Sequence, residues 1–281
     1  MDNYAVIGKP IHHSMSPFLH NAHFEQQNDA AYYTAYEVDS SDLEKTVAAF
    51  KTLKIRGWNV TVPHKIAITP FLDEVSDEAA RIGAVNTVVN VDGKLIGYNT
   101  DSRGYLNALL SMTGTLLKEM NVLVVGAGGA ARAVVYGLLD YGVTKLSVTN
   151  RTVLKIEEMQ RDFIEVGTLS SLTFAEANEC LEQFDLVINT TSIGLNGEDL
   201  DFLASNKLKE GVYLSDLIYN PEVTTWLLAN RKKARAIQNG LGMFVEQAAL
   251  AYEYWTGKSA DRPVMENLVK RKLGIEHETH K

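Results

Sequence analysis

The chain has 281 residues, 46% of them hydrophobic and 22% charged, which is ordinary for a globular protein and long enough for two domains. Its formal net charge of −8 argues against a broad phosphate-binding surface for nucleic acid, although a small anionic ligand needs only a local site. The single cysteine, Cys180, fits a reducing compartment, and because we find neither a candidate membrane span nor a secretory signal, we expect a cytoplasmic protein.

The first third of the sequence alternates strand-like and helix-like segments. Pro17 is well placed as the first residue of a helix, with Ser16 as its N-cap. Asp92-Gly93 separates two apolar runs and is typical of a tight hairpin turn. Strands are expected over residues 4–7, 31–38, 57–62, 85–91 and 95–98, and helices over 17–27, 41–54, 77–82 and 101–112.

The rest of the chain shows a cleaner alternation, with strands expected over 121–125, 145–149, 184–189 and 212–216, and helices over 130–141, 243–255 and 263–273. This pattern predicts an α/β fold with a parallel sheet covered by helices on both faces. We expect a first α/β domain at 1–102, a doubly wound domain at 103–238, and C-terminal helices at 239–281 that pack back on the first domain.

The strongest local signal is a glycine loop, Gly126-Ala127-Gly128-Gly129-Ala130-Ala131, between a strand and a helix. Gly126 permits the tight turn, Gly128 lets the backbone approach a pyrophosphate, and Ala131 lets the helix pack closely on the strand. The N–H groups at the start of the helix then face the phosphates. This context favours a Rossmann-type dinucleotide site over an ordinary tight turn.

The segment after the next strand indicates which dinucleotide is bound. An NAD site usually has an acidic residue here, which accepts a hydrogen bond from the ribose 2′-hydroxyl. The sequence instead has Asn150-Arg151-Thr152, with Lys155 one turn further on. A guanidinium can pair with a 2′-phosphate, so we expect NADP(H). The alternative is that Arg151 is a solvated loop charge.

Three segments of the first domain carry polar side chains suited to a polyhydroxylated ligand. They contain Lys65 after a strand end, Asn86 in a Gly-Ala-Val-Asn-Thr segment, and Asp101 at the end of the hairpin. A lysine in a closed site can take part in proton transfer, whereas a lone lysine is usually a surface charge.

These motifs together resemble those of the shikimate dehydrogenase family over nearly the whole chain. The resemblance rests on the segments 14–17, 59–65, 83–87, 98–101, 126–132, 150–152, 189–192, 216–221 and 239–243, and on Gln247. It implies reversible reduction of 3-dehydroshikimate to shikimate with NADPH, in the route to chorismate and the aromatic amino acids. The first domain would then bind substrate and the second NADP.

The resemblance also implies the roles of individual residues. Lys65 and Asp101 form the polar pair that handles the proton. The residues implied in substrate binding are Ser14, Ser16, Thr61, Lys65, Asn86, Asp101, Tyr219 and Gln247. Ser14 and Ser16 precede a helix start, where hydroxyl and N–H groups can bind a carboxylate. The alternative for Ser16 is a simple cap, and for Gln247 a buried packing role.

The residues implied in cofactor binding are Gly126, Ala127, Gly128, Gly129 and Ala130 for the pyrophosphate, Asn150, Arg151, Thr152 and Lys155 for the 2′-phosphate, and Leu217 and Gly240 beside the nicotinamide. Asp77 matches a position sometimes assigned to cofactor contact, and a role as helix N-cap explains it equally well.

A metal site and three rival functions have weaker support. His20 and His23 lie three residues apart on a helix, but no third ligand completes a metal site, so we expect none. A quinate dehydrogenase would often use NAD, which the missing acidic residue disfavours. A sensor of shikimate or NADP(H) would lack the Lys65–Asp101 pair, and a purely structural module would have no use for the first-domain motifs. The resemblance suggests a monomer or homodimer.

Overall fold

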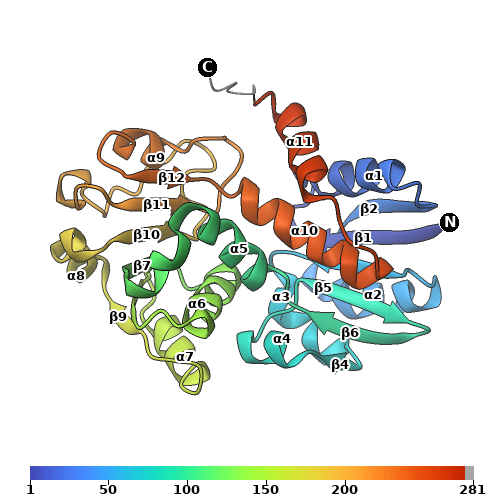
Figure 1. Ribbon diagram of the computed structural model, residues 1–281. Coiled ribbons are helices and arrows are strands. Elements are labelled where there is room, and N and C mark those ends of the chain that lie inside the picture. Colours follow the sequence, from blue (N-terminus) through green and yellow to red (C-terminus); the bar gives the residue numbers. More distant parts are fainter. Residues whose placement is uncertain (276–281) are drawn as a thin grey trace. The chain divides into compact units, whose positions relative to one another are not determined.

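The computed structural model describes residues 1–275. The chain divides into two compact units, drawn in sequence colours in Figure 1. Unit 1 contains Met1–Asp101 and the described chain from Val245 onward, and unit 2 contains Ser102–Phe244. Within the described residues, no helix is long and apolar enough to cross a membrane.

Unit 1 contains a mixed sheet in the order β2-β1-β3-β5-β6-β4. Its strands are β1 (Asp2–Gly8), β2 (Ala31–Glu37), β3 (Gly57–Val60), β4 (Glu74–Val75), β5 (Thr87–Val91) and β6 (Lys94–Tyr98). β1 pairs in parallel with β2 and β3, while β5 is antiparallel to both β3 and β6. The predicted hairpin is present, and Asp92 (φ 51°) and Gly93 (φ 93°) both have the positive φ that its tight turn requires.

Helices cover both faces of this sheet. They are α1 (Ser16–Gln26), α2 (Leu43–Thr52), α3 (His64–Ala67), α4 (Asp77–Ile82), α10 (Leu241–Thr256) and α11 (Arg262–Leu273). Successive β1 residues point to opposite faces. Tyr4 and Val6 pack with α1 and with the α10 residue Tyr252, whereas Ala5 and Ile7 pack with the α2 residue Phe50. The C-terminal helices therefore contribute to the core of unit 1, as predicted.

Two predicted helix starts in unit 1 are wrong. The N-cap of α1 is Met15, not Ser16, because Met15 already has helical dihedral angles (φ −83°, ψ −7°). Ser16 is the first helical residue, and its N–H donates to the hydroxyl of Ser14 at 3.3 Å. Helix α2 begins at Leu43 and not at the expected residue 41, because a 3₁₀ turn occupies Ser40–Asp42.

Unit 2 contains an all-parallel sheet in the order β12-β11-β10-β7-β8-β9. Its strands are β7 (Asn121–Val125), β8 (Lys145–Thr149), β9 (Ser170–Leu172), β10 (Leu186–Asn189), β11 (Tyr213–Asp216) and β12 (Ala236–Gln238). Counted from β7, this is the order 3-2-1-4-5-6 of doubly wound dinucleotide-binding folds. The strand order reverses between β7 and β10, and ligands bind such sheets at this point.

The helices of unit 2 are α5 (Asp101–Thr113), α6 (Gly129–Tyr141), α7 (Leu154–Asp162), α8 (Phe174–Glu179) and α9 (Thr225–Asn230). Leu123 and Leu214 pack on one face of the sheet with Leu181 and the α9 residue Trp226. The predicted α/β fold class, with its Rossmann-type second domain, is confirmed.

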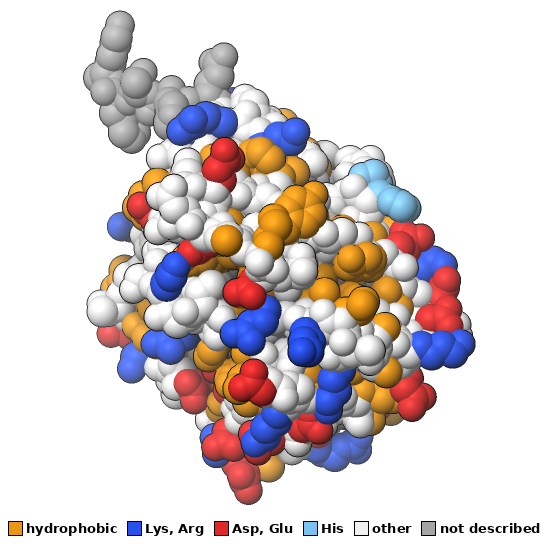
Figure 2. Space-filling view, turned by 90° about the vertical axis from the view of Figure 1, so that its right-hand side faces the viewer, with side chains coloured by type: hydrophobic (Ala, Val, Ile, Leu, Met, Phe, Trp, Pro, Cys, Tyr) orange, Lys and Arg blue, Asp and Glu red, His pale blue; other side chains and the backbone are white. Residues whose placement is uncertain are grey.

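The molecular face in Figure 2 has no continuous patch of one charge. Lys, Arg, Asp and Glu side chains are interspersed on it, with hydrophobic side chains in small groups between them. Several surface cations of unit 1 are paired, such as Lys51 with Asp73 and Lys94 with Glu74. This face therefore offers no broad charged surface for a ligand.

Candidate active site

The most distinctive polar feature of unit 1 is an ion pair between Lys65 and Asp101. Lys65 lies on the short helix α3, and Asp101 is the first residue of α5. Lys65 Nζ donates to Asp101 Oδ2 at 2.6 Å, and the two side chains are 17% and 6% exposed. The backbone N–H of Val85 donates a hydrogen bond to the Lys65 carbonyl oxygen at 2.8 Å. Charges are rarely buried unless paired, so Lys65 is not an ordinary solvated surface lysine.

Asn86 holds the other oxygen of the Asp101 carboxylate. Its side-chain Oδ1 accepts from the backbone N–H of Thr100 at 2.8 Å, and this N–H can only donate. The amide orientation is therefore fixed, with Nδ2 donating to Asp101 Oδ1 at 2.8 Å and to Thr100 Oγ1 at 2.9 Å. Asp101 thus has one oxygen bound by an amide and the other by an ammonium.

Ser14 and Ser16 lie together at the start of α1. Ser16 is 9% exposed, while Ser14 is half-buried and accepts from the Ser16 N–H. A helix N-terminus carries partial positive charge, which favours an anion. Since Ser14 uses a lone pair in this bond, its hydroxyl hydrogen remains able to donate to a ligand.

Thr61 follows β3 and packs closely on β1. A Cβ built on Gly8 would lie 2.3 Å from Thr61 Cγ2, so a glycine is needed at position 8 for this approach. Gln247 is a half-buried residue of α10 and belongs to the same unit as Lys65 and Asp101. Its contact with substrate stays a prediction.

The glycine loop of unit 2 lies between β7 and α6, at the reversal of the strand order. Gly126 has φ 116°, and a Cβ there would lie 2.4 Å from Thr190 Oγ1. At Gly128 a Cβ would meet no atom within 4 Å, so the backbone is open to a close ligand. Gly128 is the N-cap of α6, and no side chain caps this helix. These features fit a dinucleotide pyrophosphate at the helix N-terminus.

The residues after β8 fit a phosphate at the 2′ position of the adenine ribose. Asn150 Nδ2 donates to the Thr152 carbonyl at 2.9 Å and shapes the turn that presents Arg151. Arg151 is exposed and forms no ion pair with any of residues 1–275. Lys155 lies in the first turn of α7, also exposed. A free guanidinium and a nearby ammonium provide the charge that such a phosphate requires.

Leu217 and Gly240 lie against one another in unit 2. A Cβ on Gly240 would lie 1.9 Å from the Leu217 carbonyl oxygen, so only glycine fits at position 240. The Gly240 N–H donates to the carbonyl of Ile218 at 3.0 Å. Tyr219 stacks on Phe244 with ring centroids 4.8 Å apart. The structure thus brings Leu217, Tyr219 and Gly240 into one cluster at the carboxyl end of β11.

A buried carboxylate, Asp216, holds this loop in place. Its Oδ1 accepts from Asn189 Nδ2 at 3.1 Å and from the Ile218 N–H at 3.0 Å, and its Oδ2 accepts from Thr224 Oγ1 at 2.9 Å. Burial raises the pKa of Asp216, and these three hydrogen bonds oppose the rise. Asn189 and Asp216 therefore fix the ends of β10 and β11 beside the glycine loop.

Asp77 lies in unit 1, as the first residue of α4. The N-cap of this helix is Ser76, whose hydroxyl accepts from the Ala79 N–H at 3.2 Å. The interpretation of Asp77 as an N-cap is therefore wrong. A carboxylate in the first turn still favours the helix dipole, and contact with a cofactor stays a prediction.

The two histidines of α1 belong to the core of unit 1. The His20 ring stacks on Tyr33 at 4.5 Å, and burial lowers the pKa of His20 to about 3. His23 Nε2 accepts from the Asp261 N–H at 3.2 Å. Among residues 1–275, no three or more His, Cys, Asp or Glu side chains lie close enough together to hold a metal ion.

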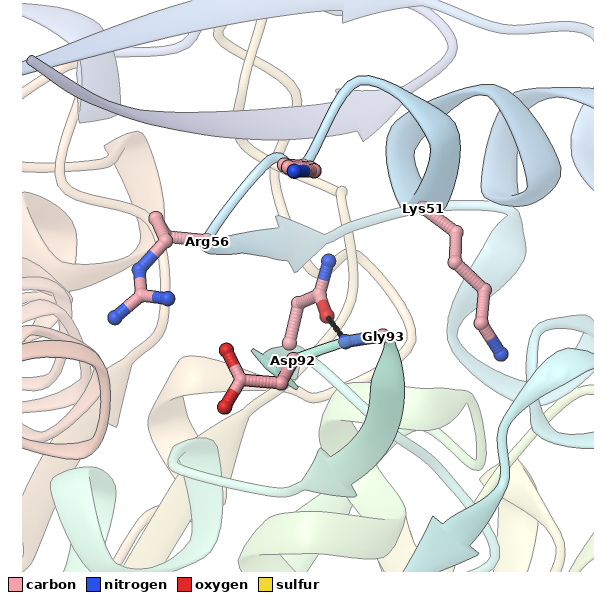
Figure 3. Close-up of a pocket in the computed structure, with 6 residues that line it drawn as sticks. Lys51, Arg56, Asp92 and Gly93 are labelled. Carbon is pink, nitrogen blue, oxygen red and sulfur yellow. Dashed lines mark hydrogen bonds between the residues drawn. The ribbon is translucent and has the colours of Figure 1, made fainter.

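A surface hollow in unit 1 is lined by Lys51, Lys54, Arg56, Asn90, Asp92 and Gly93. Figure 3 shows that the side chains of Lys51 and Arg56 point away from one another, while Asp92 lies on the Arg56 side. Asn90 Oδ1 is already used by the Gly93 N–H at 2.8 Å. Ligand sites have convergent polar groups, and this hollow does not.

Two further buried polar residues, Asn59 and Thr87, contact the Lys65–Asp101 cluster and were not among the predicted site residues. Asn59 Nδ2 donates to Thr87 Oγ1 at 3.1 Å, and Thr87 Oγ1 donates to Asn86 Oδ1 at 2.9 Å. Both residues lie inside the sheet with less than a tenth of their surface exposed. The sequence did contain one indication of a role for Asn59. This residue lies near the end of an otherwise apolar strand, where a buried side-chain amide needs a hydrogen-bond partner.

Comparisons with known proteins agree with this geometry. Three family models match: "Shikimate dehydrogenase substrate binding domain" over residues 6–88, "Shikimate / quinate 5-dehydrogenase" over 109–196, and "Shikimate 5'-dehydrogenase C-terminal domain" over 240–270. A shikimate dehydrogenase (NADP(+)) of Geobacillus sp. (strain WCH70) is 45% identical over 272 residues, which cover 96% of this chain and 98% of the relative.

Solved structures are similar as well. Shikimate 5-dehydrogenase from Thermus thermophilus, in complex with NADP(H) and shikimate, is 35% identical with a TM-score of 0.85, covering 96% of this chain and 99% of that one. Quinate dehydrogenase from Corynebacterium glutamicum, in complex with NAD, is 28% identical with a TM-score of 0.89 and the same coverage. From its full-length relatives and its two-unit α/β fold, the chain belongs to the shikimate dehydrogenase family.

Proposed function

We propose that this protein is an NADP-dependent oxidoreductase that interconverts shikimate and 3-dehydroshikimate in the biosynthesis of chorismate and the aromatic amino acids. The observation that carries the proposal is the Lys65–Asp101 ion pair, 2.6 Å long and largely buried. Such a pair is suited to exchange a proton with a substrate hydroxyl in a site from which bulk water is largely excluded.

The first unit would bind the substrate. Ser14 and Ser16 would hold its carboxylate at the start of α1, where the helix dipole favours negative charge. Hydroxyl and amide side chains would bind the ring hydroxyls, namely Thr61, Asn86 and Gln247. The resemblance to the family also implies a role for Tyr219 near the carboxylate.

The Lys65–Asp101 pair would handle the proton. When the alcohol is oxidised, a hydride leaves the carbon and the hydroxyl proton passes to the pair, so that a carbonyl forms. In the reverse direction the pair returns a proton to the carbonyl oxygen as the hydride arrives. Asn86 would keep the Asp101 carboxylate in one orientation throughout, through its bond to Oδ1.

The second unit would hold NADP(H). When bound, the nicotinamide ring of this cofactor accepts or donates the hydride. The segment from Gly126 to Ala130 would bind the pyrophosphate, while Leu217 and Gly240 would line the nicotinamide. Arg151, with Asn150, Thr152 and Lys155, would recognise the 2′-phosphate.

Domain boundaries, localisation and assembly complete the proposal. We assign residues 1–102 to substrate binding, 103–238 to cofactor binding and 239–281 to helices that return to the first domain, although residues 276–281 of the last range lie outside the described residues. A reducing compartment such as the cytoplasm suits a chain with one cysteine. The family resemblance suggests a monomer or a homodimer.

A spectrophotometric assay tests this function. Purified protein is mixed with shikimate and NADP, and NADPH absorbance is followed, with parallel reactions that contain NAD or quinate instead. We expect rapid reduction of the cofactor only in the reaction that contains both shikimate and NADP. Comparable rates with quinate and NAD would place the protein with the quinate dehydrogenases. Binding of NADP without turnover in any reaction would favour a sensor.

A further inference from the structure

Tyr33 is a buried tyrosine of β2 that lies between two parts of the candidate substrate site. It is 1% exposed, and its ring stacks on His20. The side chain of Asn21 binds its backbone twice, accepting from the Tyr33 N–H at 2.8 Å and donating to the Tyr33 carbonyl at 2.9 Å. The stacking of the ring and the two hydrogen bonds to the backbone therefore fix the position of the Tyr33 phenol.

The phenol hydroxyl contacts Asn59 in a direction that simple chemistry fixes. Asn59 Nδ2 donates to the Asn86 carbonyl oxygen at 3.2 Å, and a carbonyl oxygen can only accept. Asn59 Oδ1 must therefore face Tyr33, at 2.6 Å from its hydroxyl oxygen. Tyr33 is the donor in this bond. Burial raises the pKa of Tyr33 well above its usual value, so the phenol keeps the hydrogen that it donates.

The Ser16 side chain interacts with the same phenol and lowers its pKa, against the larger effect of burial. Because the one hydrogen of the Tyr33 hydroxyl goes to Asn59, its oxygen can only accept from Ser16. Ser16 is thus the donor, and it presents lone pairs to other groups. A carboxylate can only accept hydrogen bonds. A ligand carboxylate that binds the Ser16 hydroxyl must therefore turn the single hydrogen of that hydroxyl away from Tyr33.

From Asn59 the hydrogen bonds continue to the ion pair. Asn59 donates to Thr87 Oγ1 at 3.1 Å, Thr87 donates to Asn86 Oδ1 at 2.9 Å, and Asn86 donates to Asp101 Oδ1 at 2.8 Å. All donors point the same way, from Ser16 to Asp101. Hydrogen bonds in such a chain polarise one another, so a change at one end is felt at the other.

We propose that Tyr33 is a positioning residue that couples the carboxylate-binding hydroxyl of Ser16 to the Lys65–Asp101 pair through this chain of buried hydrogen bonds. Tyr33 is buried and would contact neither the substrate nor the cofactor. It fixes Asn59, which fixes Thr87 and Asn86, and so sets the orientation of the carboxylate that handles the proton. The inference rests on the proposed function, because it assigns the two ends of the chain to substrate binding and proton transfer.

The test removes the phenol hydroxyl and leaves the ring, as Tyr33→Phe. Tyr252→Phe is the matched control, because Tyr252 is a fully buried tyrosine of the same unit whose hydroxyl donates to Asp29 at 2.7 Å, outside the chain. We expect kcat to fall about tenfold in Tyr33→Phe, from the loss of one buried hydrogen bond, while the Kd for shikimate changes less than about threefold. The control should keep the wild-type kcat.

Coupling is measured with a double-mutant cycle that combines Tyr33→Phe with Ser16→Ala. The double variant should be at least about threefold more active than the product of the single losses predicts. A second pair checks the middle of the chain: Thr87→Val should lower kcat, and Thr87→Ser, which keeps the hydroxyl, should restore it. These readouts would not respond to a purely structural role.

The outcomes separate the two proposals. If wild type reduces NADP with shikimate but Tyr33→Phe matches Tyr252→Phe, or if the losses of Ser16→Ala and Tyr33→Phe simply multiply, the coupling is absent and the proposed function stands. If wild type itself does not turn over shikimate, the proposed function fails and the inference fails with it.

Discussion

Replacement of Lys65 by methionine tests the central ion pair, because the change keeps the length of the side chain and removes its charge. Asp101 is then left with a carboxylate that is 6% exposed and has lost its partner on Oδ2, while Asn86 still holds Oδ1. A buried acceptor left without its partner costs about 1–3 kcal/mol. We therefore expect the free energy of unfolding, measured by urea titration, to fall by about this amount.

The same variant should lose activity far more than it loses binding. Proton transfer by a positioned side chain contributes about 10²–10⁴-fold to turnover, so kcat should fall within this range. In the proposed site, several other side chains would hold shikimate, so its Kd, measured by fluorescence titration, should rise about tenfold or less. The double variant Lys65→Met/Asp101→Asn should regain stability without activity, since no unpaired charge remains.

Two results would refute this reasoning. Equal losses in kcat and in shikimate affinity would mean that Lys65 only binds substrate. A stability equal to that of wild type in Lys65→Met would mean that the Asp101 charge is solvated or neutral without its partner.

Three further predictions concern the cofactor and the core. Arg151→Ala should raise the KM for NADP about tenfold and leave that for NAD unchanged, because one charge-assisted contact is lost, whereas the exposed Arg231→Ala should change neither. Gly240→Ala should lower the free energy of unfolding by about 1–3 kcal/mol and weaken NADP binding, since its Cβ would overlap the Leu217 carbonyl; unchanged affinity in a calorimetric titration would contradict this. His20 has a pKa of about 3 in the folded protein, below its unfolded value, so the unfolded state binds more protons between these values and stability falls as the pH drops below about 6.5. His20→Phe should flatten this part of the urea-derived stability profile by up to about 1.4 kcal/mol per pH unit.

The longer elements of the fold could be predicted because their local signals agree with their tertiary surroundings. Asp92-Gly93 specified a tight turn that needs two positive φ angles, and the structure has them. Short elements such as β9 and β12, with three residues each, could not be predicted, because three residues show no period. The N-cap of α1 was predicted one position too late, at Ser16 and not at Met15. No local sequence pattern indicates that Met15 adopts helical dihedral angles.

The residue types of the candidate site could be predicted from the sequence, but the hydrogen bonds that connect them could not. Lys65, Asn86 and Asp101 were expected to act together, and the structure places all three in one hydrogen-bonded group. The link through Tyr33 and Asn59 depends on the parallel register of β2, β1 and β3, which no local pattern encodes. A tyrosine on a buried strand is expected to have only a packing role as long as the hydrogen-bond partner of its hydroxyl is unknown.

Isotope transfer tests the central claim most directly. Shikimate that carries deuterium on the carbon to be oxidised is incubated with the protein and NADP, and the reduced cofactor is analysed by mass spectrometry. Direct hydride transfer predicts one deuterium in each NADPH formed, with 3-dehydroshikimate as the other product. Unlabelled NADPH, or release of the deuterium into water, would contradict the proposed reaction.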